Sequence, residues 1–236
     1  MSRFYQEIEP YYEDIFKPRP PQLKLLKASA PGKRVLDLAC ATGAVAAALA
    51  AETDFDVTAL DLEASMIERA KQKPGITAVV GDMLAPPKGP FDLIYCIGNS
   101  LPHLPTAEKI AEFFQVTYDR LATPGTLVLQ WINFAPFLKQ EGKELGTLST
   151  IENDRVKFER FYRRDGEYIA FDTILTVDGK QFDNRERLFP LLTEDARRYA
   201  LDAGYEDIEF FGNFNGDPLD LETSVPVVMR CRKKER

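Results

Sequence analysis

The stretch Val35-Leu36-Asp37-Leu38-Ala39-Cys40-Ala41-Thr42-Gly43 places a short apolar run directly before a loop of small residues. Residues 34–38 predict a buried strand, and the alanine-rich residues 44–51 predict a helix, because alanine has high helix propensity. Small residues at positions 39, 41 and 43 let the backbone approach a ligand closely, and the helix that follows exposes unpaired N–H groups. The stretch therefore predicts a strand, a tight ligand-binding loop and a helix.

Strand and helix patterns continue to alternate after this loop. Strands are expected at 57–61, 77–81, 91–97 and 126–132, and helices at 63–73 and 107–121. Pro124-Gly125 predicts the central pair of a type II turn before the last of these strands. Strands that alternate with helices in this way predict right-handed βαβ units and a parallel sheet covered on both faces.

Helical patterns precede the first strand. Residues 3–16 carry apolar side chains at helical spacing, including Phe4, Ile8 and Tyr12, and predict an amphipathic helix that also carries Tyr5. The proline-rich segment 17–21 ends it, and residues 22–29 predict a second short helix.

The pattern changes after residue 133. Residues 155–164, 167–178 and 181–190 alternate polar and apolar side chains, and Asp165-Gly166 and Asp178-Gly179 are strong hairpin signals between them. We therefore expect three antiparallel strands there. A helix at 193–203, closed by Gly204, and two strands at 207–211 and 224–231 are expected to finish the main sheet.

These elements predict an α/β fold with a Rossmann-like seven-stranded mixed sheet, helices on both faces and a small antiparallel β extension. We expect one domain over 1–236, with an N-terminal helical cap (1–30), a cofactor-binding core (31–135), an antiparallel insert (150–190) and a closing helix and hairpin (191–236). The insert could cap the acceptor site, where a second molecule would bind beside the cofactor. Alternatively, its exposed edge could pair with a second copy in a homodimer.

Composition excludes several classes of protein. The apolar fraction of 44% and the charged fraction of 28% are typical of a globular protein, and the net charge of −7 disfavours a nucleic-acid partner. No apolar leader or membrane-spanning run is visible, and Cys40, Cys96 and Cys231 are expected to be reduced thiols, so we expect a cytoplasmic protein without a membrane partner. With His103 as the only histidine, no metal site is expected.

Acidic and small residues follow the other predicted strands. Because ligands of open parallel sheets bind at the carboxyl ends of the strands, Asp61, Asp82 and Gly98-Asn99-Ser100 are candidates for a binding site. Asp61 is placed to accept both hydroxyls of a ribose, and Asp82 could accept the adenine amino group. A dinucleotide enzyme is disfavoured, because the G-x-G-x-x-G pattern needs glycine at three positions and alanine stands at the corresponding positions 39, 41 and 44. The residues thus predict an adenosine site without phosphates.

In their order and spacing, the stretch 35–43, Asp61, Gly81-Asp82-Met83 and the segment 91–98 resemble the motifs of class I S-adenosylmethionine-dependent methyltransferases. The segment 96–105 is similar to that of glycine N-methyltransferase and related small-molecule methyltransferases. The resemblance implies S-adenosyl-L-methionine as cofactor, S-adenosyl-L-homocysteine as product, and the class I methyltransferase fold. Ala41 departs from the glycine that is usual in the family.

The resemblance also implies a set of cofactor-binding residues. They are Tyr12, Arg19, Asp37, Ala39, Cys40, Ala41, Gly43, Asp61, Leu62, Met66, Gly81, Asp82, Met83, Cys96, Ile97, Gly98 and Ser100. Substrate-binding residues are expected at Asn99, His103, Trp131 and Asn133, although core packing is an alternative for Trp131. For Tyr12 and Met66, ordinary packing is also an alternative, and for Arg19 the alternative is a solvated arginine on the surface.

The expected reaction is in-line methyl transfer to nitrogen or oxygen of a small molecule, in which orientation of the reactants supplies much of the rate. The catalytic residue is unknown from sequence; His103 is a candidate base, and its alternative role is to order the loop around the cofactor. Two further functions stay open: an RNA or protein methyltransferase, and a non-catalytic S-adenosylmethionine-binding protein.

Overall fold

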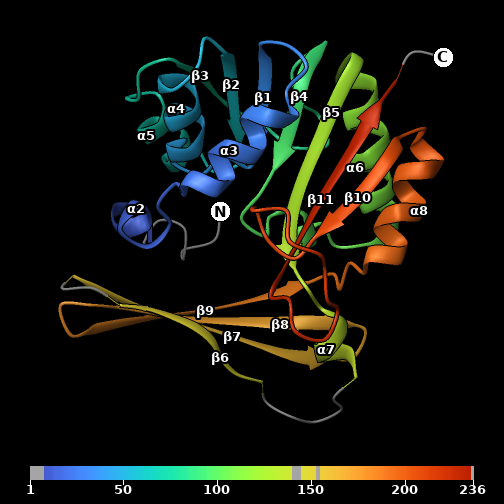
Figure 1. The fold of residues 1–236 in the computed structure, drawn as a ribbon. Helices are drawn as coiled ribbons and strands as arrows, with labels where there is room; N and C mark the ends of the chain where they lie inside the picture. Colours follow the sequence, from blue (N-terminus) through green and yellow to red (C-terminus); the bar gives the residue numbers. More distant parts are fainter. Residues whose placement is uncertain (1–7, 140–144, 153–154, 235–236) are drawn as a thin grey trace.

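A seven-stranded mixed sheet forms the centre of the chain in a computed structural model that describes residues 8–139, 145–152 and 155–234 (Figure 1). The strand order is β10-β11-β5-β4-β1-β2-β3. The strands are β1 (Arg34–Leu38), β2 (Asp56–Asp61), β3 (Ile76–Val80), β4 (Phe91–Cys96), β5 (Leu121–Ile132), β10 (Glu206–Phe211) and β11 (Pro226–Lys233). The predicted Rossmann-like sheet is confirmed.

The order in which the chain adds strands reverses at β1: β2 and β3 lie on one side of it, and β4 and β5 lie on the other. Strand β1 pairs in parallel with β2 on one side and with β4 on the other, whereas β11 runs antiparallel to β5. Val35, Leu36 and Leu38 are fully buried because helices cover both faces here. Loops that leave β1 and β4 therefore part at the carboxyl edge, and this switch point is where open α/β sheets bind ligands.

Two pairs of helices cover the sheet. Apolar side chains of α3 (Pro20–Ser29) and α4 (Ala44–Ala51) pack on one face, and those of α6 (Ala107–Arg120) and α8 (Thr193–Ala203) pack on the other. Helix α5 (Ala64–Ala70) contacts β2 and β3. Phe113 and Phe114 of α6 are fully buried, and each such side chain contributes about 1.5–3 kcal/mol by leaving water.

A second, antiparallel sheet lies at the carboxyl edge of the first (Figure 1). It contains β6 (Leu145–Glu152), β7 (Val156–Asp165), β8 (Tyr168–Val177) and β9 (Lys180–Leu188) in that order. Asp178 and Gly179 both have positive φ, as the predicted β8–β9 hairpin requires. The three expected strands are confirmed as β7, β8 and β9. Strand β6 was not predicted; Leu148 and Ile151 are three positions apart and break the period of two that marks a strand.

The N-terminal helices differ from the prediction. The described part of the amphipathic segment forms a 3₁₀ turn, η1 (Glu9–Tyr11), and a short helix, α2 (Tyr12–Ile15), while Phe4 and Tyr5 lie outside the described residues. Helix α3 begins at Pro20 rather than at residue 22, because proline is well suited to the first helical position.

Two loops also differ. The type II turn predicted at Pro124-Gly125 is wrong: Gly125 pairs with Lys233 as part of the long strand β5 and does not have the positive φ that such a turn needs. After β5 the chain forms the short helix α7 (Ala135–Leu138), which was not predicted, and after β4 it forms the 3₁₀ turn η2 (Leu101–His103).

Candidate functional site

Asp61 joins the ends of three neighbouring strands. Its Oδ2 accepts a hydrogen bond from the backbone N–H of Ala41 in the loop after β1, at 2.7 Å, and its Oδ1 accepts one from Glu63, at 2.9 Å. The backbone carbonyl of Asp61 accepts from the N–H of Gly81, at 2.9 Å, after β3. Burial raises the pKa of Asp61, while these backbone donors act in the opposite direction. The carboxylate is thus held at the carboxyl edge with acceptor capacity left for a ligand.

The loop after β4 is held open beside β1. The N–H of Gly98 donates to Oε1 of Gln130 at 2.8 Å, and Oδ1 of Asn99 accepts from the N–H of Ile132 at 2.9 Å. Gly98 has φ of +91°, and a Cβ built there would meet no heavy atom within 4 Å. This loop therefore leaves a cradle whose floor is bare backbone, into which any larger side chain would project.

The first cavity runs from these strand ends to the antiparallel sheet. Its volume of about 320 Å³ lies within the range of small-molecule sites. Twelve of the residues expected from sequence line it: Tyr12, Ala39, Ala41, Asp61, Leu62, Gly81, Asp82, Met83, Gly98, Asn99, Ser100 and His103. The structure thus brings the predicted adenosine side and part of the predicted acceptor side into one space.

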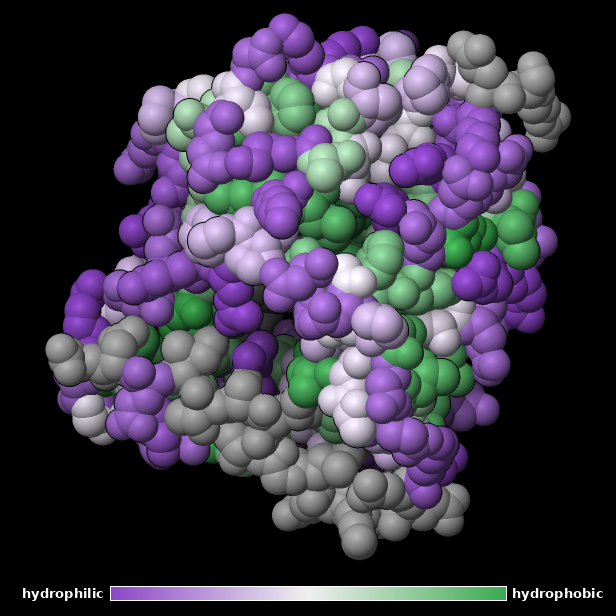
Figure 2. Space-filling view, in the orientation of Figure 1, coloured by the Kyte–Doolittle hydropathy of each residue, from purple (hydrophilic) through white to green (hydrophobic). Residues whose placement is uncertain are grey.

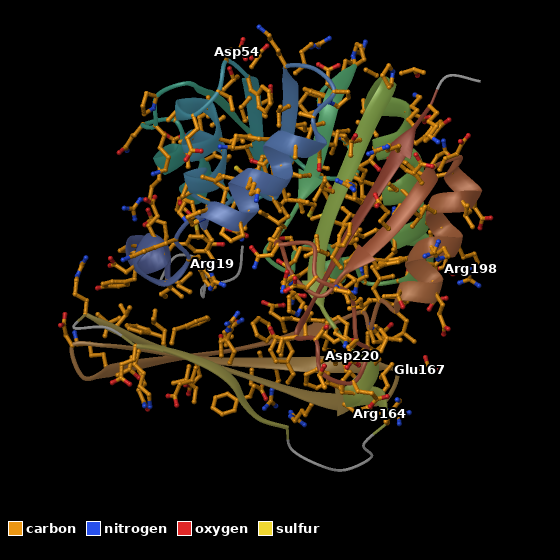
Figure 3. All side chains as sticks on the ribbon, viewed as in Figure 1. Arg19, Asp54, Arg164, Glu167, Arg198 and Asp220 are labelled. Carbon is orange, nitrogen blue, oxygen red and sulfur yellow. The ribbon has the colours of Figure 1, made fainter. Side chains whose placement is uncertain are left out.

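The second cavity, of about 400 Å³, lies on the other side of the cradle. The expected residues that line it are Tyr12, Arg19, Asp37, Ala39, Cys40, Ile97, Gly98 and Asn99. Oδ2 of Asp37 accepts a hydrogen bond from the hydroxyl of Tyr95 at 2.9 Å, and burial raises the pKa of Asp37 well above its usual range. Arg19 lies between the N-terminal helices and the antiparallel sheet (Figure 3). An acid and a guanidinium therefore share this cavity.

Three expected cofactor residues lie outside the lining of both cavities. Gly43 is the N-cap of α4 with φ of +70°, and a Cβ there would lie 3.0 Å from Ala70, so its small size serves packing. Met66 is buried in the cluster that joins the N-terminal helices to the antiparallel sheet. Cys96 is fully buried among core side chains at the end of β4.

Trp131 and Asn133, expected to face the acceptor, also lie outside both linings. The indole N–H of Trp131 donates to the carbonyl of Leu191 at 2.9 Å, and its ring is fully buried. The amide of Asn133 donates to the carbonyls of Leu221 and Ser224, each at 3.0 Å. Both side chains are thus engaged in holding the connections that follow β9 and β10.

The antiparallel sheet supplies cavity residues that the sequence interpretation did not name. Phe158, Arg160 and Tyr162 of β7 and Phe171 of β8 line the first cavity. Phe158 and Tyr162 are more buried than their neighbours along the strand, and Arg160 shares their face by the period of two. That pattern identifies the face, but only the placement of the insert shows what the face covers.

His103 faces these aromatic residues. Its ring packs edge-on against Phe171, with 6.5 Å between the ring centroids. Burial lowers the pKa of His103, and the charge of Glu186 opposes this. The imidazole is therefore held in its neutral form at pH 7, with a lone pair able to accept a proton.

The site fits an adenosine-containing cofactor on two grounds. Oε2 of Glu63, beside Asp61 in the first cavity, is buried without a hydrogen-bond partner among the described residues, and the Gly98 cradle admits a ligand. On the face shown in Figure 2, a recess opens between the N-terminal helices and the antiparallel sheet, with hydrophilic residues along its rim.

Neither a metal cluster nor a membrane span is found in the described part of the chain. No group of three or more His, Cys, Asp or Glu side chains within it could hold a metal ion. None of the helices within residues 8–139, 145–152 and 155–234 is both long and apolar enough to cross a bilayer.

Known proteins resemble this chain in sequence and in fold. Residues 35–125 match a family model described as a methyltransferase domain. A glycine/sarcosine N-methyltransferase of Aphanothece halophytica is 30% identical over 198 aligned residues, which cover 77% of this chain and 69% of that protein. An S-adenosylmethionine-dependent methyltransferase from Clostridium acetobutylicum ATCC 824 has a TM-score of 0.80 at 16% identity and covers 99% of this chain and 100% of its own. The CcbJ methyltransferase from Streptomyces caelestis has a TM-score of 0.81 at 20% identity, with 97% and 96% covered. At these identities the two structures show a shared fold.

Proposed function

This chain belongs to the class I S-adenosylmethionine-dependent methyltransferases, and we propose that it methylates an amine nitrogen of a small molecule held between its two sheets. One observation carries the proposal: a single cavity reaches from Asp61 and Asp82 to His103 beneath the antiparallel sheet. A space of about 320 Å³ that also receives adenosine leaves room for a small acceptor only.

Residues of the cavities hold the cofactor at both ends. Asp61 receives the ribose hydroxyls, Asp82 and Met83 lie at the adenine, and Arg19 receives the methionine carboxylate in the second cavity. Tyr12 and Phe16 line both cavities, where their ring faces stabilise a nearby positive charge by about 0.5–2 kcal/mol. When bound, S-adenosylmethionine supplies an electrophilic methyl group on a sulfonium.

His103 prepares the acceptor. A free amine is mostly an ammonium at pH 7 and must lose one proton before nitrogen can attack, which a neutral imidazole can accept. The name of the Aphanothece relative, an N-methyltransferase, supports the same choice of nitrogen.

Calorimetry of S-adenosylmethionine binding tests the cofactor assignment. Asp61→Ala should weaken binding at least about tenfold, because a hydrogen bond to a charged group contributes about 1.5–3 kcal/mol. Asp56→Ala is the matched control, since Asp56 is an exposed residue at the other end of the same strand. Equal affinity of Asp61→Ala and wild type would remove Asp61 from the site.

A turnover screen of small amines and alcohols tests the choice of nitrogen. Turnover is measured as the S-adenosylhomocysteine formed, and exclusive turnover of alcohols would refute the choice.

A further inference from the structure

Arg160 of β7 lies where the two cavities meet. Six residues line both cavities: Tyr12, Phe16, Ala39, Gly98, Asn99 and Arg160. Of these, Arg160 is the one with a charged side chain, and it comes from the antiparallel sheet rather than from the sheet that holds the cofactor motifs. A positive charge is therefore presented to the junction from the acceptor side.

The cross-strand neighbours of Arg160 on the same sheet face are polar, whereas its neighbours along the strand are aromatic. In the strand register Arg160 pairs with Thr173, and Thr173 pairs with Asn184. The adjacent apolar row contains Phe158 and Leu175. Thr173 is almost fully buried, and its hydroxyl has no hydrogen-bond partner among the residues that the structure describes. A donor thus lies beside the guanidinium in a place where polar groups are costly.

The electrostatics of the junction favour an anion. Burial lowers the pKa of Arg160, and the positive charge of Arg19 lowers it as well, while Tyr162 and Tyr12 act in the opposite direction. The guanidinium of Arg160 also lies over the ring of Phe16, 5.9 Å from its centroid. Two guanidiniums near one cavity raise the free energy of each, and an anion bound there would reduce this cost through charge-assisted hydrogen bonds.

We propose that Arg160 receives an anionic group of the acceptor, a carboxylate or a phosphate, and so selects acidic acceptors. The inference rests on the proposed function, because it names the class of molecule that the same site methylates. Arg19, which lines the second cavity alone, remains the partner of the cofactor carboxylate. Held at Arg160, the anionic group leaves the amine between the Gly98 cradle and His103.

Binding of simple anions to the protein saturated with S-adenosylhomocysteine tests the proposal. Acetate, inorganic phosphate and the neutral acetamide are titrated by NMR into wild type and into Arg160→Gln. Wild type should bind acetate or phosphate saturably and acetamide not at all, and Arg160→Gln should lose at least about tenfold in anion affinity. The anion that binds more tightly identifies the carboxylate or the phosphate class.

Arg164→Gln is the matched control. Arg164 lies on the same strand and, two pleats on, points to the same face, but it lies beside α7, where it donates to the carbonyl of Leu138 (Figure 3). This variant should bind the anion as wild type does. If Arg160→Gln fails to fold, Arg160→Lys keeps the charge and should retain weakened anion binding.

The outcomes separate the two proposals. Failure of wild type to bind S-adenosylhomocysteine would overturn the site itself. Normal binding of S-adenosylhomocysteine without anion binding, or with equal anion affinity in Arg160→Gln, would overturn the role of Arg160 alone. A loss of S-adenosylhomocysteine affinity in Arg160→Gln with unchanged anion binding would assign Arg160 to the cofactor and would likewise overturn it.

Discussion

Buried acids at the ends of β1 and β2 lie in this site, and neither forms an ion pair with another of the described residues. Asp61 is stabilised by backbone donors from two loops, and Asp37 by the hydroxyl of Tyr95. Burial raises the pKa of both, and the charge of Asp61 raises that of Asp37 further. A cluster of this kind destabilises the protein as its acids ionise, which is acceptable where a cationic ligand is to be bound.

Asp37→Asn should change how stability depends on pH. Because the pKa of Asp37 is higher in the folded than in the unfolded chain, its contribution is present at low pH and is lost as pH rises through the folded pKa. The variant lacks this loss. The free energy of unfolding of the variant, measured with urea, minus that of wild type should therefore be larger at pH 8 than at pH 5. The variant is thus stabilised relative to wild type as the pH rises.

Asp54→Asn serves as the control for this measurement. Asp54 is an exposed residue at the opposite end of the molecule (Figure 3), and its pKa is lowered by Lys33. Its titration is complete below pH 5, so the difference from wild type should be the same at both pH values. A constant difference for Asp37→Asn as well would contradict the raised pKa.

His103→Asn should abolish the acid limb of the pH–rate profile. Burial lowers the pKa of His103 below the usual 6.5, so wild-type kcat/KM should fall only as pH drops below that value. Loss of the base should lower kcat by about a hundredfold or more, in the range of general base catalysis. The rates are measured with an acceptor identified by turnover. An unchanged acid limb in the variant would leave His103 with a structural role only.

Single residues of the site were predictable where they end a strand. Asp61 and Asp82 follow apolar runs, and parallel strands bring their carboxyl ends to one edge. Trp131 and Asn133 end β5 in the same way, yet each is engaged by carbonyls from distant connections. Nothing local to positions 131–133 specifies those partners, so the sequence could not separate a cavity residue from a core residue there.

At the scale of elements, ion pairs and a hydrogen bond connect the N-terminal helices η1 and α2 to α5 and to the residues that follow it. Arg69 donates to the carbonyl of Glu9 at 2.7 Å and pairs with its carboxylate at 3.1 Å, and Lys73 pairs with Glu13 at 2.7 Å. Tyr12 and Phe16, which line both cavities, are positioned by these contacts. The helices therefore act as one wall of the site.

Arg69→Ala should weaken cofactor binding more than it weakens the fold. Partly exposed ion pairs contribute about 0–1 kcal/mol, so the free energy of unfolding should change little. S-adenosylmethionine affinity should fall because Tyr12 and Phe16 are no longer positioned by the contacts of Arg69 with Glu9. Lys71→Ala is the control, since Lys71 pairs within α5 with Glu68. Equal affinities of the two variants, measured by calorimetry, would show that α5 does not support this wall.

The elements of the main sheet could be predicted because burial on both faces leaves continuous apolar runs between turn signals. The antiparallel sheet could be predicted in part, from its hairpin dipeptides. Strand β6 lacks regular alternation, and the contact of Phe158 and Arg160 with the cavity depends on how a whole sheet is placed. Pairing at long range between elements leaves no periodic trace in a single segment.

At the scale of the whole molecule, the two sheets form separate hydrogen-bonded units (Figure 1). Residues of both line the first cavity. The main sheet contributes Asp61, Asp82 and the Gly98 cradle to the first cavity, and the antiparallel sheet contributes aromatic side chains and Arg160. An apolar cluster that includes Ile8, Met66 and Phe158 holds the N-terminal helices, α5 and the antiparallel sheet together. We infer that the main sheet holds the cofactor and that the antiparallel sheet holds the anionic group of the acceptor.

A crystal structure of the protein with S-adenosylhomocysteine tests this account most directly. The account predicts ribose hydroxyls within hydrogen-bonding distance of the Asp61 carboxylate, adenine beside Asp82 and Met83, and the sulfur at Gly98, facing the cavity that contains His103. Adenosine bound elsewhere, or a ribose turned away from Asp61, would contradict it.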